Sequence, residues 1–311
     1  MRHRFLDRQF QIDASPHSTH LEALPDSVAR PLGKGYSGIH HFCEKLLLST
    51  LQGKETAPGV AELLAMLQAD PRFDTAIADL PGRVTCLLEG LTHPMNAAAL
   101  RGVLGQVSND ITVDAVDICD TPAIYAANQI DVPGVCFQIG DAADLGDVFD
   151  DATFDVLVQD GLLNCAPHAQ HPAILAEAAR VAKPNALLIC TVTDETTMGM
   201  VPKISREDLL DLYDITWDPF AYGLNDLVAS NTDWAALIDA IGGYAVPTGS
   251  SEFVAITSPF GHFEYFAPIS RTLRLMQDAG FELVIQVTAT QRDSNGFDCR
   301  RHRLLLRKTD A

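Results

Sequence analysis

The strongest constraint on the fold is an alternation of short apolar segments with helical patterns between residues 83 and 193. Runs rich in strand-forming residues recur at 83–88, 111–116, 135–139, 154–158 and 186–192. A helical pattern at 270–279 and two further strand patterns at 281–288 and 302–307 follow. This order predicts an α/β fold with a mostly parallel seven-stranded sheet and helices on both faces.

Two segments depart from this alternation. Residues 1–80 begin with an irregular proline-containing arm and continue with helical patterns at 37–52, 59–68 and 71–78, so we predict a helical N-terminal extension that serves as a lid. Residues 194–266 hold both tryptophans and half of the aromatic side chains, and we predict a cap insertion over the active site. The cofactor-binding core then consists of residues 81–193 and 267–311.

Composition excludes several classes of partner. The formal charge of −19 repels phosphate backbones, so we expect no nucleic acid partner. No run of about 18 apolar residues occurs, and we expect no membrane partner. The seven cysteines are scattered without a C-x-x-C pair, which favours a reducing, cytoplasmic location and no metal site. Homo-oligomerisation is left open.

Polar residues follow the predicted strands, where open α/β sheets bind ligands. Asp117 ends the second strand and is suited to accept hydrogen bonds from ribose hydroxyls; the alternative is a solvated carboxylate. Asp141 follows the third strand and is suited to an adenine amino group, with Ala142 leaving room for the ring; the alternative is a helix N-cap.

Several motifs between residues 113 and 193 are matched in order by a known family. They are VDAVDI, FQIGDAADL, ATFDVLVQDGLLN and AILAEAARVAKPNALLICTV, in which Glu177, Arg180, Val181, Lys183 and Pro184 fit the pattern E-x-x-R-V-L-K-P-G-G. The chain thereby resembles the class I S-adenosylmethionine-dependent methyltransferases over residues 80–193 and 270–308. The resemblance implies a Rossmann-like fold, S-adenosyl-L-methionine as cofactor and methyl transfer as the activity.

The loop after the first strand departs from that family, because residues 90–96 contain one glycine where the family has two or three. The same loop also lacks the G-x-G-x-x-G fingerprint of dinucleotide-binding proteins. With this departure noted, the predicted cofactor-binding residues are Tyr36, Glu89, Gly90, Asn96, Asp117, Ile118, Asp141, Ala142, Gln159 and Asp160.

Catalysis and substrate binding are assigned to groups near the predicted pocket mouth. Asp160 and His168 are the candidate general bases, and Trp217, Tyr222 and Arg271 are the candidate substrate-binding residues. We expect methylation of a small molecule, with an amino-acid-like acceptor among the possibilities. Two alternatives stay open: another reaction of S-adenosylmethionine, such as cyclisation or aminocarboxypropyl transfer, and a non-catalytic binding protein.

Overall fold

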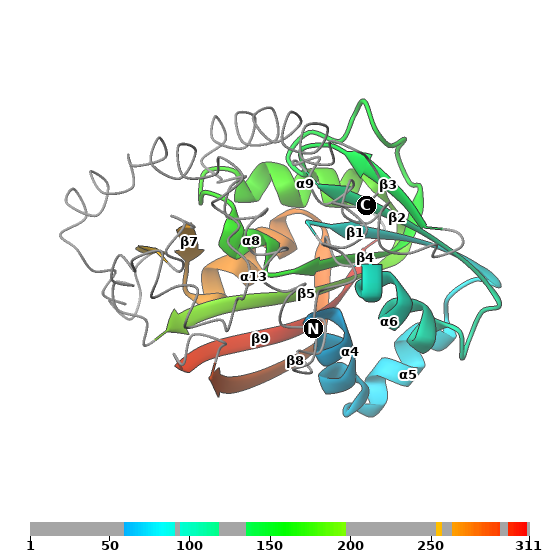
Figure 1. The fold of residues 1–311 in the computed structure, drawn as a ribbon, viewed down its shortest axis with the longest axis horizontal. Helices are drawn as coiled ribbons and strands as arrows, with labels where there is room; N and C mark the ends of the chain where they lie inside the picture. The colour runs from blue at the N-terminus through cyan, green and yellow to red at the C-terminus, as the bar shows by residue number, and fades with distance from the viewer. Residues whose placement is uncertain are drawn as a thin grey trace, which may run out of the picture.

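The computed structural model describes residues 59–90, 94–117, 135–196, 253–256, 263–292 and 298–309. These residues build a seven-stranded sheet in the order β3-β2-β1-β4-β5-β9-β8 (Figure 1). The strands are β1 (Arg83–Glu89), β2 (Asp110–Asp117), β3 (Val135–Ile139), β4 (Phe154–Asp160), β5 (Ala182–Thr196), β8 (Phe281–Arg292) and β9 (Asp298–Lys308).

The sheet is mostly parallel, as the sequence predicts. Strands β1 to β5 pair in parallel, and β9 pairs antiparallel with both β5 and β8. Strand order reverses between β1 and β4, since the chain first runs outward from β1 to β3 and then returns to β4. The carboxyl ends of these two strands therefore mark the point where such sheets bind ligands.

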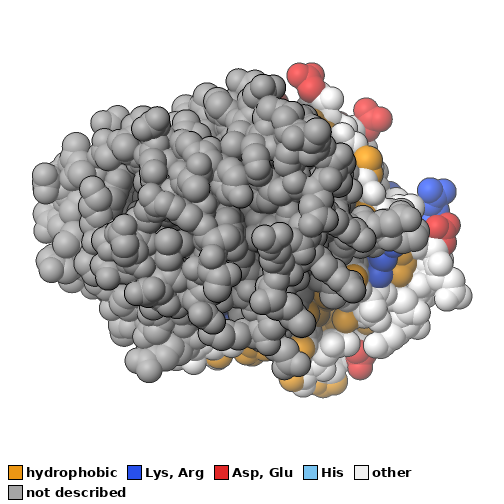
Figure 2. All heavy atoms as spheres, in the orientation of Figure 1, with side chains coloured by type: hydrophobic (Ala, Val, Ile, Leu, Met, Phe, Trp, Pro, Cys, Tyr) orange, Lys and Arg blue, Asp and Glu red, His pale blue; other side chains and the backbone are white. Residues whose placement is uncertain are grey.

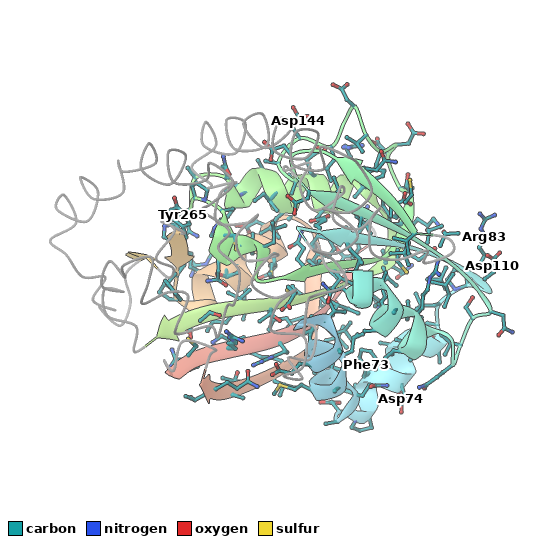
Figure 3. The ribbon with its side chains drawn as sticks, viewed as in Figure 1. Phe73, Asp74, Arg83, Asp110, Asp144 and Tyr265 are labelled. Atoms are coloured by element: carbon teal, nitrogen blue, oxygen red, sulfur yellow. The ribbon has the colours of Figure 1, made fainter. Side chains whose placement is uncertain are left out.

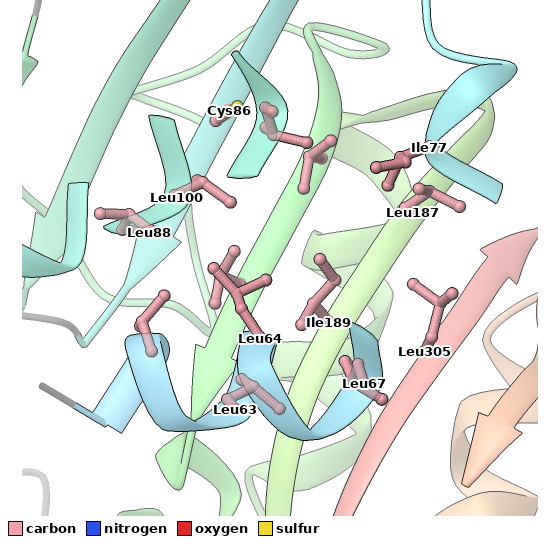
Figure 4. Close-up of a cluster of buried hydrophobic side chains, with 14 of the residues drawn as sticks. Leu63, Leu64, Leu67, Ile77, Cys86, Leu88, Leu100, Leu187, Ile189 and Leu305 are labelled. Carbon is pink, nitrogen blue, oxygen red and sulfur yellow. The ribbon is translucent and has the colours of Figure 1, made fainter. Parts of the chain in front are cut away.

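Helices cover both faces of the sheet (Figure 1). On one face α4 (Gly59–Gln68), α5 (Pro71–Ala78) and α6 (Pro94–Leu104) pack with residues such as Cys86, Leu88 and Ile189 into one apolar core (Figure 4). On the other face α8 (Leu162–Cys165), α9 (His171–Val181) and α13 (Ile269–Asp278) pack with Leu87, Leu157 and Leu188. Successive residues of each central strand thus enter opposite cores, which explains why the strands are apolar throughout.

Helices α4 and α5 correct the boundary predicted at residue 80. Val60, Leu63, Leu64 and Leu67 recur at i, i+3, i+4 and i+7, and each is at most 1% exposed. They pack against the sheet beside α6 (Figure 4). Residues 59–78 therefore belong to the core layer rather than to a lid, and residues 1–58 lie outside the described part of the chain.

The predicted cap insertion contributes a short hairpin. Strands β6 (Phe253–Ile256) and β7 (Phe263–Phe266) pair antiparallel, and Phe266 is fully buried beside α8. Strand β5 extends to Thr196, so the first residues assigned to the insertion are the end of a core strand. Residues 197–252 lie outside the described ranges, and the domain division there stays a prediction.

The surface of the described part carries charges of both signs. Acidic and basic side chains lie among apolar atoms along the edge visible in Figure 2. Arg83 and Asp110 lie near each other at the amino-terminal edge of the sheet, with 3.7 Å between Arg83 Nε and Asp110 Oδ2 (Figure 3). No helix among the described residues is long and apolar enough to cross a membrane.

Candidate active site

A pocket lies where the order of the strands reverses, at the carboxyl ends of β1 to β4 and beside α8 and α9. It has a volume of about 700 Å³ including its open mouth. Its lining consists of Gly90, Val116, Asp117, Gly140, Asp141, Ala142, Asp160, Leu162, Cys165, Ala166, Pro167, Gln170 and Ile174.

The ionisable side chains of this lining are mainly acidic. Asp117, Asp141 and Asp160 contribute carboxyl groups, and no lysine, arginine or histidine is among the described residues of the lining. Val116, Leu162, Ala166, Pro167 and Ile174 supply apolar surface. Such a wall favours a ligand with hydroxyl or amino donors, a flat apolar part and positive charge, and it disfavours phosphates.

The turn after β3 brings the backbone close to the pocket. A Cβ on Gly140 would lie 3.0 Å from Val116 Cγ2 and 3.1 Å from Val148 Cγ2, so a larger residue there would displace both. Asp141 Oδ1 accepts a hydrogen bond of 3.0 Å from the Ala143 amide, so this carboxylate also holds its own turn. The two interpretations of Asp141 are therefore compatible, because a residue that caps the turn also lines the pocket.

Glu89 and Gln159 lie beneath the floor of the pocket instead of in its lining. Each is 1% exposed, and Gln159 Nε2 donates a hydrogen bond to Glu89 Oε2. Burial raises the pKa of Glu89 to about 8, against the hydrogen bond from Gln159, which lowers it. The residues that follow them, Gly90 and Asp160, do line the pocket. Neither Glu89 nor Gln159 lines the pocket itself, and their contact with the cofactor stays a prediction.

Asp160 lies between the pocket and the first turn of α4. A Cβ on Gly59 would fall 1.8 Å from Asp160 Oδ2, so a larger residue at position 59 would require the carboxyl group or the helix to shift. Burial raises the pKa of Asp160, with the Thr191 hydroxyl and the two arginines Arg301 and Arg303 acting in the opposite direction. A carboxyl group of raised pKa that lines a pocket is a candidate proton acceptor.

The segment after β4 joins the pocket to the β6–β7 hairpin. Asn164 is buried and donates to the carbonyl oxygens of Thr193 at 2.8 Å and Tyr265 at 2.9 Å, while its Oδ1 accepts from the Thr193 amide. His168 Nε2 lies 3.0 Å from the Phe266 carbonyl oxygen. Through these contacts α8 and the segment that follows it hold β7 against the end of β5.

His168 also packs against two rings, edge to face. The centroid of the His168 ring lies 5.5 Å from that of Tyr265, which is labelled in Figure 3, and 5.3 Å from that of His171. Because a carbonyl oxygen only accepts, Nε2 of His168 carries hydrogen, and Nδ1 is the proton acceptor of the neutral ring. His168 follows Pro167 of the pocket lining but does not line the pocket itself.

Other predicted residues lie farther from the pocket or outside the description. Asn96 is buried at the start of α6, and Arg271 lies in the first turn of α13; neither is a lining residue. Tyr36, Ile118, Trp217 and Tyr222 fall outside the described residues. The apolar wall from α8 and α9 was not predicted from the sequence, although the position of α8 directly after β4 could have indicated it.

The family comparison agrees with this arrangement. Residues 96–190 match the family model described as a methyltransferase domain. This stretch is similar to a methyltransferase domain. It runs from α6 into the first part of β5 and includes most of the pocket lining, and the resemblance to class I S-adenosylmethionine-dependent methyltransferases is confirmed.

Solved structures of similar fold share little sequence with this chain. A methyltransferase from Methanosarcina mazei is 16% identical, covers 78% of this chain and 99% of its own, and gives a TM-score of 0.49. The 1,6-didemethyltoxoflavin-N1-methyltransferase of Burkholderia thailandensis is 14% identical. The match covers 82% of this chain and 92% of that protein, with a TM-score of 0.45. The cyclase SpnF is 16% identical. The match covers 77% of this chain and 81% of SpnF, with a TM-score of 0.45. Among curated proteins, no sequence matches this chain.

Proposed function

We propose that this chain is an S-adenosylmethionine-dependent methyltransferase of small molecules. The observation that carries the proposal is the pocket at the strand-order reversal, in which the described residues bring together three carboxyl groups and an apolar wall and include no basic side chain. A cationic nucleoside with a free ribose fits this chemistry, whereas the pyrophosphate of a dinucleotide does not.

The residues present suit S-adenosylmethionine group by group. Asp117 is half-buried at the end of β2 and offers acceptors to ribose hydroxyls. Asp141 and Ala142 offer an acceptor and space to an adenine ring, and the wall from α8 and α9 would supply apolar surface for it. The bound cofactor would supply an electrophilic methyl group on a positively charged sulfur.

Catalysis by this chain would consist mainly of orientation and exclusion of water. The hairpin held by Asn164 and His168 packs against α8, and Leu162 and Cys165 of α8 line the pocket. His168, with Nδ1 as the acceptor nitrogen, is the candidate base for an acceptor that carries a proton, and Asp160 is the second. For an acceptor without a proton, such as a thioether, neither group is required.

An amino-acid-like acceptor extends the same proposal. Tyr265 is half-buried against His168 and offers an aromatic face that favours an ammonium group. Arg271 lies in the helix that follows this hairpin and is the described residue that we assign to a carboxylate. Trp217 and Tyr222 remain predicted substrate-binding residues.

Calorimetry tests the cofactor first. S-adenosylmethionine and S-adenosylhomocysteine should bind with micromolar affinity, and NAD⁺ and ATP should not bind. Asp117→Asn should weaken binding about tenfold or more, because hydrogen bonds to a charged group are worth about 1.5–3 kcal/mol. Asp110→Asn, at the opposite edge of the sheet, is the matched control. Unchanged affinity in Asp117→Asn would remove this residue from the ribose site.

The reaction is tested separately with cofactor labelled in the methyl group and a metabolite extract. Transfer of label to a small molecule with release of S-adenosylhomocysteine supports the proposal. Release of methylthioadenosine would indicate chemistry on the methionine chain instead. Binding without turnover of any extract would favour a non-catalytic protein.

A further inference from the structure

Two buried oxygens beside the pocket floor have no donor. Glu89 Oε1 and Gln159 Oε1 are inaccessible to solvent and make no hydrogen bond, although the other halves of the same two groups are joined to each other. A buried polar atom without a partner destabilises the folded state, and a buried unpaired charge destabilises it more. Two such atoms in one side-chain pair require an explanation.

The two side chains lie side by side at the strand ends. Leu88 of β1 is the register partner of Val158 of β4, so Glu89 and Gln159 occupy the next pair of positions. On the other side of β1 the partner of Glu89 is Val116, which has no polar side chain. Because the Gln159 amide already donates to Glu89 Oε2, an ionised Glu89 leaves both remaining oxygens without hydrogen.

One proton resolves both deficits. If Glu89 Oε1 carries hydrogen, it donates to Gln159 Oε1 while Gln159 Nε2 donates to Glu89 Oε2, and the two groups close a ring of two hydrogen bonds. Charge supports the same state, since Glu177 on α9 acts on Glu89 as a like charge and no cation among the described residues offsets it. Burial acts in the same direction.

We infer that Glu89 is a neutral carboxylic acid that forms a cyclic acid–amide pair with Gln159 and positions the cofactor pocket. The pair joins the residues immediately before Gly90 and Asp160, and both of these line the pocket. It therefore fixes the spacing of the two strand ends that frame the floor. Glu89 is a positioning residue rather than an anionic cofactor ligand. This inference rests on the proposed function only where cofactor binding is the readout.

Infrared spectroscopy tests the proton directly. The difference between wild type and Glu89→Gln at pH 6.5 should contain the carbonyl band of a protonated carboxylic acid. Asp160 is present in both proteins and cancels. A difference that contains only carboxylate bands would overturn the inference.

Cofactor binding tests the positioning role. Glu89→Gln replaces the acid–amide ring by an amide–amide ring, so its affinity for S-adenosylhomocysteine at pH 6.5 should stay within about threefold of wild type. Glu89→Ala leaves Gln159 unpaired and should weaken binding about tenfold or more. At pH 9 wild type should weaken towards Glu89→Ala, and Glu89→Gln should not. Equal losses in both variants at pH 6.5 would indicate an anionic ligand and overturn the inference.

Two further variants serve as controls for this test. Asp114→Asn removes another acid of raised pKa from β2, outside the pocket lining, and should leave affinity unchanged at both pH values. If Glu89→Gln does not fold, the double variant Glu89→Gln/Gln159→Glu restores the pair with its partners exchanged and should show the acid band. If wild type binds no cofactor, the proposed function fails, and the infrared band alone decides on the pair.

Discussion

Two buried carboxyl groups at the same end of the sheet have opposite electrostatics. Glu89 is 1% exposed and has an amide as its partner, and burial raises its pKa to about 8. Asp194 is 8% exposed; burial acts to raise its pKa as well, but His302 and Arg300 outweigh burial and lower it. Partners rather than depth therefore decide which buried acid is charged.

The Asp194 cluster links three elements around one carboxylate. Arg300 donates to it through Nε at 2.8 Å and Nη2 at 2.9 Å, and His302 Nε2 lies 2.9 Å from Oδ1 without the alignment of a hydrogen bond. His302 Nδ1 lies 2.8 Å from the Thr288 hydroxyl. The cluster thus ties β5, β9 and β8 together near the start of α13, in the half of the sheet away from the cofactor pocket.

Removing Asp194 should produce the largest effect. Asp194→Ala leaves Arg300 and the buried His302 without their carboxylate, and we expect a loss of about 3 kcal/mol in the free energy of unfolding at pH 7. Because the pKa of Asp194 is lowered by folding, the loss should be full above pH 5 and should shrink as the pH falls below 3.8, its ordinary value. Urea denaturation at several pH values measures this. A loss that does not depend on pH would mean that Asp194 contributes by packing alone.

Glu89→Gln should show the opposite dependence on pH. Folding raises the pKa of Glu89 from 4.5 to about 8, so wild type loses stability as the pH rises between these values. The variant does not titrate there, and its stability relative to wild type should increase by about 2–3 kcal/mol from pH 5 to pH 8. Urea denaturation of both proteins at these two pH values provides the comparison. Parallel curves for the two proteins would contradict the raised pKa.

Asp160 is a third acid at this end of the sheet; it lines the pocket beside the first turn of α4, and burial raises its pKa as it does that of Glu89. Gly59→Ala places a Cβ where Asp160 Oδ2 lies, so either the helix or the carboxyl group must move. We expect a loss of about 1–2 kcal/mol in unfolding free energy, as for other overpacked sites. Gly82→Ala, where an added Cβ meets nothing within 4 Å, is the control. Equal stabilities of the two variants would show that α4 does not depend on this contact.

The smallest effect should come from Thr288→Val. This change removes the hydroxyl next to His302 Nδ1 and keeps the shape of the side chain, with Gln286 Nε2 at 3.2 Å as a remaining partner. We expect a loss of about 0.5–1 kcal/mol, and no change in cofactor affinity, because the cluster lies away from the pocket. A clear change in affinity by calorimetry would mean that the two halves of the sheet are coupled.

Much of the pocket could be predicted from local sequence. Asp117, Asp141 and Ala142 follow strands whose apolar runs are evident, and the parallel sheet brings their ends to one edge. The apolar wall from α8 and α9 was missed because Leu162, Cys165 and Pro167 have no chemistry that marks a binding site. The side chains of Glu89 and Gln159 were assigned to the pocket because strand position alone does not reveal whether a side chain lies in a lining or beneath it.

The sequence by itself determined the order and nature of the strands and helices, because hydrophobic periodicity is a local property of the chain. It also determined the methyltransferase-like pattern of the core. Only the tertiary structure decided that α4 is a core helix, that Glu89 meets Gln159 and that Asp194 meets Arg300 and His302. These partners are separated by 70 residues or more along the chain. The neighbours of a buried charge, and so its protonation, are therefore set by the order of the strands rather than by the adjacent sequence.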